Sequence, residues 1–329
     1  RFPYYITMPK MVRVTLKNKL APWTTAKDII LEVLRIMSVK GGVGKIVEYA
    51  GDGLQYLTVP ERATITNMGA ELGATTSVFP SDEVTKAFLK AQGREEVWTE
   101  LKADEDAVYD EEIEIDLSTL VPLVAKPHMP DQVVTVKEIE GLKVDQCCIG
   151  SCTNSSLYDM LKVAKILKGH TVHPDVSLVI APGSKQVFNM LAETGALADM
   201  IEAGARIIEC GCGPCIGMGQ SPKTNAVSLR TNNRNFYGRS GTKSASIYLV
   251  SPEVAAVAAI TGVVTNPADF GEPPVVTMPD SFKVNDNMVI LPSATPDDVE
   301  VVRGPNIKPF PAHHKLADTV EGKTLIKES

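Results

Sequence analysis

The chain has 329 residues, of which 44% are hydrophobic and 22% are charged, and its formal net charge is −7. At roughly 100–200 residues per domain, this length predicts two domains. The negative charge argues against a general role on nucleic acid or on an anionic membrane, and no apolar run approaches the roughly 20 residues that span a bilayer. An anionic ligand would therefore need a local cluster of Arg or Lys.

Residues 1–125 are predicted to form a first α/β unit. A strand is expected at Val12–Leu16. The capping signal Thr25–Asp28 then introduces an amphipathic helix, whose apolar positions are Ile29, Ile30, Val33, Leu34 and Met37. A second helix is predicted over Pro60–Gly73, with the proline as its first residue and the glycine at its end. The acidic stretch Asp104–Asp116 is expected to be a solvated face or a sheet edge.

The second half of the chain alternates strands and helices after Lys126–Pro130, which is expected to be a linker. The predicted elements are, in order, Val144–Ile149 and a helix from about Ser156, Val176–Ala181 and a helix near Lys185, a strand at Arg206–Ile208, then Ser246–Val250 and a helix over Pro252–Thr261. This alternation implies a mainly parallel sheet covered by helices on both faces. Ligands of such sheets bind at the carboxyl ends of the strands. From Asn266 onward proline is frequent, and Arg303–Pro311 is expected to be an extended connector.

The six cysteines fall into two tight groups. They are Cys147, Cys148 and Cys152 in the first, and Cys210, Cys212 and Cys215 in the second. A secreted disulfide framework would spread them through a shorter chain. The clustering instead favours a metal centre or redox chemistry.

Two cysteine motifs follow predicted strands. In Gly150–Ser156, a Cys at a strand-to-helix turn lies near backbone N–H groups, which predicts a lowered pKa for the Cys152 thiol. In Cys212–Cys215, the neighbouring glycines leave room for a bulky group near the backbone. Together the two loops offer three thiolates. On a four-iron cluster these would leave one iron open to act as a Lewis acid.

Spacing alone leaves other interpretations open. A zinc site could use Cys148, Cys152, Cys212 and Cys215. The CxxC pair also matches a redox dithiol, and the thiols could simply be buried and inert. Cys147 and Cys148 are adjacent in a strand and face opposite ways, so both are expected to be packing residues, and Cys210 is expected to be structural.

Two further motifs carry polar side chains. In Asn233–Arg239, Arg234 and Arg239 can form bidentate contacts with carboxylates. Asn67 and Glu71 are four residues apart on a predicted helix and share a face; Glu71 could act as a general acid, although an exposed polar face without chemistry fits the spacing too. The segment Lys40–Lys45 resembles a phosphate-binding loop, but it lacks the following Ser or Thr and the preceding strand, so nucleotide binding is set aside.

In this order and spacing, the motifs GSCTNSS, CGPCIG and NRNFxGR resemble the aconitase superfamily. The resemblance runs from about Val12 to Lys327, and Ser251–Glu253 adds to it. The stretch Ala63–Pro80 is similar to aconitases proper, whereas isopropylmalate dehydratases usually differ there and between the paired cysteines. Met218 and Gly219 depart from the Gln-Trp pair that many aconitases carry, which points to a divergent branch.

The resemblance implies an α/β fold of aconitase-like three-layer domains, with mainly parallel sheets flanked by helices. Residues 1–125 would be the second domain with the end of the first, 126–300 the third domain with the cluster cysteines, and 301–329 a linker to a swivel domain. It implies a 4Fe–4S cluster and roles for the site residues as follows: Cys152, Cys212 and Cys215 as cluster ligands, Asn67 and Asn233 beside the cluster, Glu71 on the leaving hydroxyl, and Arg234 and Arg239 on substrate carboxylates.

The implied activity is a hydro-lyase that isomerises citrate and isocitrate through cis-aconitate, a reaction of the tricarboxylic acid cycle. The alternatives are a related dehydratase of isopropylmalate or homoaconitate, and a non-enzymatic, iron-sensing cluster protein. We expect a small tricarboxylate substrate, no membrane or nucleic-acid partner, and a cytoplasmic location (mitochondrial in a eukaryote). The flanking domains of the same enzyme, with the catalytic base, are expected to lie outside this chain.

Overall fold

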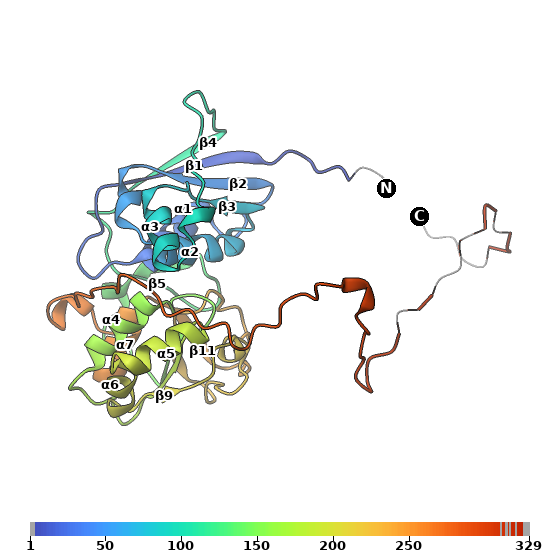
Figure 1. Ribbon diagram of the computed structural model, residues 1–329. Helices are drawn as coiled ribbons and strands as arrows, with labels where there is room; N and C mark the ends of the chain where they lie inside the picture. Colours follow the sequence, from blue (N-terminus) through green and yellow to red (C-terminus); the bar gives the residue numbers. More distant parts are fainter. Residues whose placement is uncertain (1–3, 310, 313–314, 316, 320, 325–329) are drawn as a thin grey trace. The chain divides into compact units, whose positions relative to one another are not determined.

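A computed structural model describes residues 4–309, 311–312, 315, 317–319 and 321–324. The chain divides into two compact units, residues 1–284 and 285–329. All the α-helices and strands of the described residues belong to the first unit, which contains two β-sheets. Figure 1 shows each sheet with its own set of helices.

The first sheet has four parallel strands in the order β3-β2-β1-β4. Their bounds are β1 Lys10–Lys17, β2 Lys45–Ala50, β3 Thr76–Val78 and β4 Glu111–Asp116. The predicted strand at Val12–Leu16 is confirmed as β1, where Val12, Val14 and Leu16 are fully buried. The acidic stretch is confirmed as a sheet edge, because β4 pairs only with β1.

Three helices accompany this sheet: α1 Ala26–Met37, α2 Val59–Met68 and α3 Glu83–Ala91. The predicted capping box begins α1, since the Thr25 backbone N–H donates to Asp28 Oδ2 at 2.8 Å. The helix predicted over residues 60–73 is shorter than expected. It ends at Met68 and continues as a 3₁₀ turn, η2 Gly69–Leu72, which Gly73 closes with a φ of 76°.

The second sheet has seven strands in the order β6-β5-β11-β10-β7-β8-β9. Their bounds are β5 Leu123–Ala125, β6 Val133–Thr135, β7 Gln146–Gly150, β8 Ser177–Ala181, β9 Arg206–Ile207, β10 Val227–Arg230 and β11 Ser246–Leu249. The strands from β11 to β9 are parallel, and β5 and β6 add an antiparallel hairpin at one edge. Residues 126–132 connect the two strands of this hairpin, so the predicted linker lies inside the second sheet.

The helices of the second sheet are α4 Leu157–Leu167, α5 Lys185–Glu193, α6 Ala196–Glu202 and α7 Pro252–Thr261. The predicted helices at Ser156, Lys185 and Pro252–Thr261 are therefore confirmed. In α7 every residue from Val254 to Ala259 is fully buried, which accounts for the apolar sequence of this stretch. The predicted fold class, α/β with mainly parallel sheets flanked by helices, is confirmed.

The order of the second sheet creates a switch point beside β7. The chain runs from β7 through α4 to β8 on one side, whereas β10 pairs with β7 on the other side. Loops that leave neighbouring parallel strands in opposite directions open a crevice at the carboxyl edge of the sheet. The loops after β7 and β10 meet there.

The proline-rich end of the chain contains no helix longer than one 3₁₀ turn among its described residues. Those turns are Pro267–Asp269 and Pro296–Asp298. Residues 303–309 of the expected connector carry no strand, and residue 310 lies outside the described residues. Nowhere in the described part of the chain is a helix both long enough and apolar enough to cross a bilayer.

Candidate active site

Cys152 lies on the loop that leaves β7, and this loop is tightly constrained. Gly150 and Ser151 have φ angles of 94° and 107°, in the region that side chains rarely adopt. A Cβ at Gly150 would lie 2.0 Å from the Ala181 carbonyl oxygen. Ser155 Oγ donates to the Ser151 carbonyl at 2.6 Å, and Asn232 Nδ2 donates to Ser151 Oγ at 2.8 Å. A strained turn held by several bonds is typical of functional sites.

Cys212 and Cys215 lie on a second turn, the 3₁₀ helix η5 Gly213–Ile216, which Cys212 precedes and which contains Cys215. Arg230, which is fully buried at the end of β10, donates to the Pro214 carbonyl and, at 3.1 Å, to the Gln220 carbonyl. The guanidinium therefore holds the turn and the segment that follows it. Its fork of donors suits this role, because it can bind several carbonyls in one plane.

The cysteines divide by exposure. Cys152, Cys210 and Cys212 are exposed and Cys215 is half-buried, whereas Cys147 and Cys148 are buried within β7. The expected packing role of Cys147 and Cys148 agrees with this burial. The expectation for Cys210 is wrong, because an exposed thiol has no packing role.

The pKa prediction for Cys152 is also wrong. Partial desolvation, together with the neighbouring Cys212 thiol, raises the pKa of Cys152 above its ordinary value. The helix N-terminus that was expected to lower it begins only at Leu157, beyond a capping box formed by Ser156 and Asp159. Asp159 thus occupies the position near the helix start that the thiolate was expected to use.

Among the described residues, no three His, Cys, Asp or Glu side chains are placed to hold a single metal ion. This counts against the zinc alternative, as does the burial of Cys148 in β7. A four-iron cluster is different because its thiolates bind separate irons and need not converge on one point. Three soft sulfurs on two adjoining loops, with Arg239 Nη2 at 3.9 Å from Cys215 Sγ, fit such an anionic group.

A buried carboxylate faces these loops from the first sheet. Glu71 lies on η2, its side chain is 3% exposed, and its Oε1 accepts from Arg234 Nε at 2.6 Å. Its Oε2 is buried and has no partner. Burial raises the pKa of Glu71, and the hydrogen bond and charge of Arg234 oppose that rise. One oxygen is therefore held in place and the other remains available to a ligand.

The loop after β10 supplies the other polar groups. Asn233 Nδ2 donates to Asn67 Oδ1. The two predicted amides are therefore in contact, one from α2 beside the first sheet and one from the loop after β10 of the second. Arg234 is 45% exposed in its side chain. Arg239 is half-buried, and its Nε is buried without a partner. The structure thus brings Asn67, Glu71, Asn233 and Arg234 into direct contact, with Arg239 beside Cys215.

Three further residues were not anticipated from the sequence: Lys27, Arg230 and Asn232. Lys27 had a signal, because it shares a helix face with Ile30, Leu31 and Leu34 at the spacing of core positions. A lysine on an apolar helix face needs a buried partner. Arg230 and Asn232 carried no comparable signal, since only the sheet order shows what lies beside them.

A separate cavity of about 660 Å³ lies at the ends of β2 and β3. Its wall includes Tyr49 and Phe79, whose rings stack at 4.5 Å, together with Arg13 and Tyr109. None of the predicted site residues lines it, so it is distinct from the site at the switch point.

Comparison with protein families places the chain in a known family. The model of the aconitase family (aconitate hydratase) matches residues 1–142 and 137–262. Among curated proteins, the chain is 46% identical over 270 residues to 3-isopropylmalate dehydratase large subunit 1 of Thermotoga maritima, covering 81% of this chain and 64% of that protein. It is 42% identical over 267 residues to 3-isopropylmalate dehydratase large subunit 2 of Archaeoglobus fulgidus, with coverage of 81% and 64%.

The chain therefore spans about 64% of the length of these relatives. Among solved structures, Thermococcus kodakaraensis aconitase X in its holo form aligns with a TM-score of 0.40 and 17% identity, over 72% of this chain and 52% of that one. This likeness is too low to support an argument about the site.

Proposed function

The chain belongs to the aconitase family, and on that premise we propose that it is the cluster-binding part of a hydro-lyase of the 3-isopropylmalate dehydratase type. The observation that carries this proposal is the identity of 46% and 42% to two large subunits of that name, over 81% of the chain. The citrate activity and the tricarboxylic acid cycle expected from residues 63–80 are not supported by these relatives. The alternative drawn from the sequence fits them better.

We propose Cys152, Cys212 and Cys215 as the ligands of a 4Fe–4S cluster. When bound, such a cluster supplies an iron with an open position that polarises the hydroxyl of the substrate. The exposed or half-buried state of the three thiols and the cations around them support this assignment.

The two arginines supply the substrate-binding charge. 3-Isopropylmalate carries two carboxylates and one branched apolar group, whereas citrate carries three carboxylates. Arg234 and Arg239 can each hold one carboxylate. Shortly after Cys215, which Arg239 contacts, Ile216 and Met218 are 46% and 65% exposed. We assign these two apolar side chains to the isopropyl group, since exposed apolar area at a polar site favours an amphipathic ligand.

Glu71 is positioned to handle the departing hydroxyl. Burial raises the pKa of this carboxyl, and its Oε2, which has no partner among the described residues, can exchange a hydrogen bond with the leaving oxygen. The amides of Asn67 and Asn233 orient the same region. We propose that the base that removes the proton from the adjacent carbon comes from the part of the enzyme beyond this chain, and that a second subunit completes the site, as the name of the relatives suggests for them.

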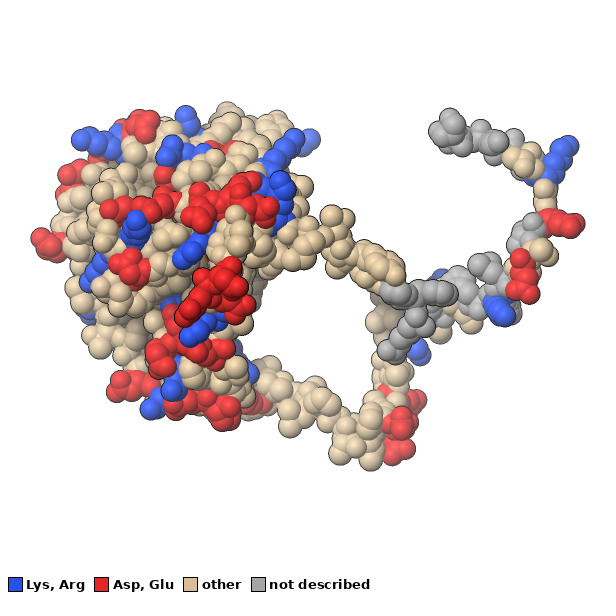
Figure 2. Space-filling view, turned by 90° about the horizontal axis from the view of Figure 1, so that it is seen from above, with Lys and Arg blue, Asp and Glu red and all other residues tan. Residues whose placement is uncertain are grey.

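Charge distribution offers no support for the non-enzymatic, nucleic-acid-binding alternative. On the face seen in Figure 2, basic and acidic side chains are interspersed over the body of the molecule. A nucleic-acid surface would instead gather Lys and Arg into a continuous patch.

The test is an anaerobic assay of the complete enzyme, reconstituted with iron and sulfide, on 3-isopropylmalate, citrate and homocitrate. We expect the highest kcat/KM on 3-isopropylmalate. Cys152→Ser should lose both bound iron and activity, while its matched control Cys148→Ser keeps both. A preference for citrate would refute the substrate assignment, and full iron binding in Cys152→Ser would refute the ligand assignment.

A further inference from the structure

We propose that Lys27 is a positioning residue of this site, which fixes the loop after β10 against the first sheet. Lys27 lies in the first turn of α1 and is completely buried. Its Nζ donates to the carbonyl oxygens of Thr231 at 3.0 Å and Asn232 at 2.7 Å, and to Asn233 Oδ1 at 3.5 Å. All three acceptors belong to one loop of the other sheet.

A buried ammonium is costly unless its donors are satisfied. Burial lowers the pKa of Lys27 to about 8, while Glu71, Cys152 and other anionic groups oppose the shift. The lysine therefore remains largely charged near neutral pH, with oxygen acceptors for its three donors. A methionine or leucine would pack on this apolar helix face without that cost, so packing alone does not explain the lysine.

The place of Lys27 is fixed from its own side. The neighbouring Asp28 closes the capping box of α1 and accepts from the Leu123 backbone N–H at 2.7 Å. The start of α1 is thus bonded to the strand β5. The Lys27 ammonium therefore keeps its position independently of the loop after β10. It acts as a fixed point for Thr231 and Asn232.

The residues held by Lys27 connect directly to the chemistry. Asn233 contacts Asn67, and Arg234, the next residue, bonds Glu71. Asn232 also donates to Ser151, which precedes Cys152. The Lys27 ammonium therefore positions the loop after β10, and this loop bonds both Glu71 and the residue that precedes Cys152. Its importance for turnover rests on the proposed function; its hold on the loop does not.

Hydrogen–deuterium exchange on the metal-free full chain tests the hold directly. Lys27→Met keeps the volume of the side chain and removes its donors. We expect exchange in residues 228–239 to rise by about tenfold or more, since charge-assisted bonds to two carbonyls are lost. Lys162→Met is the matched control, because Lys162 is a second largely buried lysine, bonded to Glu253 and not to this loop.

Equal exchange in Lys27→Met and Lys162→Met, or a uniform rise across the whole chain, would overturn the proposal. Should Lys27→Met fail to fold, Lys27→Gln retains amide donors and should show a smaller rise confined to the same residues. In the complete enzyme, Lys27→Met should lower kcat/KM, with partial rescue by Lys27→Arg. Loss of loop protection in an enzyme with no dehydratase activity would refute the proposed function and leave this inference standing.

Discussion

In the described part of the chain, two ion pairs have a buried carboxylate, and one of them is at the candidate site. Glu71 and Arg234 approach to 2.6 Å, with side-chain exposures of 3% and 45%. Glu253 and Lys162 approach to 3.1 Å, with exposures of 4% and 14%. In each pair one carboxylate oxygen is buried without a partner. The two carboxylates are therefore alike in burial, whereas Arg234 is more exposed than Lys162.

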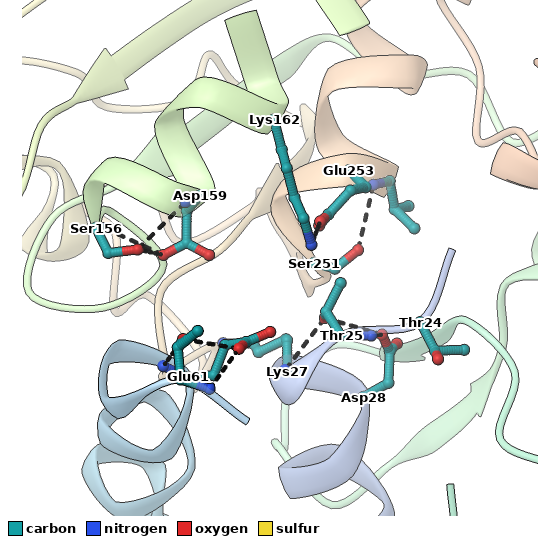
Figure 3. A network of polar contacts seen from close by, with 12 residues as sticks. Thr24, Thr25, Lys27, Asp28, Glu61, Ser156, Asp159, Lys162, Ser251 and Glu253 are labelled. Atoms are coloured by element: carbon teal, nitrogen blue, oxygen red, sulfur yellow. Dashed lines mark hydrogen bonds and ion pairs between the residues drawn. The ribbon is translucent and has the colours of Figure 1, made fainter. Parts of the chain in front are cut away.

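Local structure separates them. Glu253 lies in the first turn of α7, and it faces acids that begin other helices: Asp28 of α1, Glu61 of α2 and Asp159 of α4 each close a capping box. Figure 3 shows these helix starts and their acidic side chains grouped around Lys162 and Glu253. Acids are favoured at helix N-termini. The start of a helix therefore accounts for every carboxylate in this group.

Glu71 has no such explanation. It sits in the 3₁₀ turn η2, whose N-cap residue Met68 makes no side-chain cap, and its partner comes from the other sheet. Helix capping explains the buried acids around Glu253, but it does not explain Glu71. A buried carboxylate without such a structural reason is a candidate catalytic group.

The largest expected effect comes from neutralising each carboxylate in turn. In the complete enzyme, Glu71→Gln should lower kcat by roughly 10²–10⁴-fold, because a positioned proton donor or acceptor is lost. Glu253→Gln should leave kcat within a few-fold of wild type. Steady-state kinetics on 3-isopropylmalate would measure both. Equal losses in the two variants would remove the distinction between the pairs.

Much of this contrast could be anticipated from the sequence. The capping box at Thr25, the helix from about Ser156 and the helix at Pro252–Thr261 depend on neighbours in the chain, so local patterns predict them correctly. The cysteine and Asn-Arg motifs, which are also read from adjacent residues, placed the candidate residues on the loop after β7, the turn η5 and the loop after β10.

Contacts between distant elements could not be predicted in this way. The pairing of Arg234 with Glu71 depends on the order of strands in the second sheet, and β10, which positions it, was not predicted at all. The lowered pKa expected for Cys152 was wrong because partial desolvation and the neighbouring Cys212 thiol, which comes from a distant loop, raise it. The buried Lys27 was missed because its acceptors lie 204 and 205 residues away.

For stability, we expect the larger effect at the other pair, Glu253–Lys162. Lys162→Met leaves Glu253 buried and unpaired, so the free energy of unfolding should fall by about 3 kcal/mol. Arg234→Met also leaves a buried carboxylate, but the cation it removes is 45% exposed and the charge of Lys27 still lowers the pKa of Glu71, so the loss should be smaller, about 1 kcal/mol. Urea denaturation of the two variants gives both values. A larger loss for Arg234→Met would make Glu71–Arg234 the structural pair.

Arg239, which pairs with no carboxylate among the described residues, allows a finer comparison. Arg239→Lys keeps the charge but not the planar fork of donors, and kcat/KM should fall by about tenfold or more. Arg35→Lys is the matched control, because Arg35 also makes a forked pair, with Glu32 on the surface of α1. An unchanged kcat/KM in Arg239→Lys would place Arg239 outside the substrate site.

The smallest effect concerns pH and the capping acids. Burial raises the pKa of Asp28 to about 7, against the hydrogen bonds from Leu123 and Thr25. The folded state then binds this proton more tightly than the unfolded state, so the contribution of Asp28 to stability is complete at low pH and is lost as the pH rises through 7. Between about pH 6 and about pH 8, the free energy of unfolding should fall by about 1 kcal/mol on this account.

Asp28→Asn removes that contribution. It also removes the Asp28 charge that raises the pKa of Lys27, which burial lowers to about 8 in wild type, so the stabilisation that Lys27 gives as the pH rises begins at a lower pH in the variant. Urea denaturation at several pH values should show that wild type loses stability relative to Asp28→Asn as the pH rises. Parallel pH profiles would mean that Asp28 does not titrate in this range. The activity of the complete enzyme should keep its pH profile in Asp28→Asn, because this carboxylate serves the start of α1 and not the substrate.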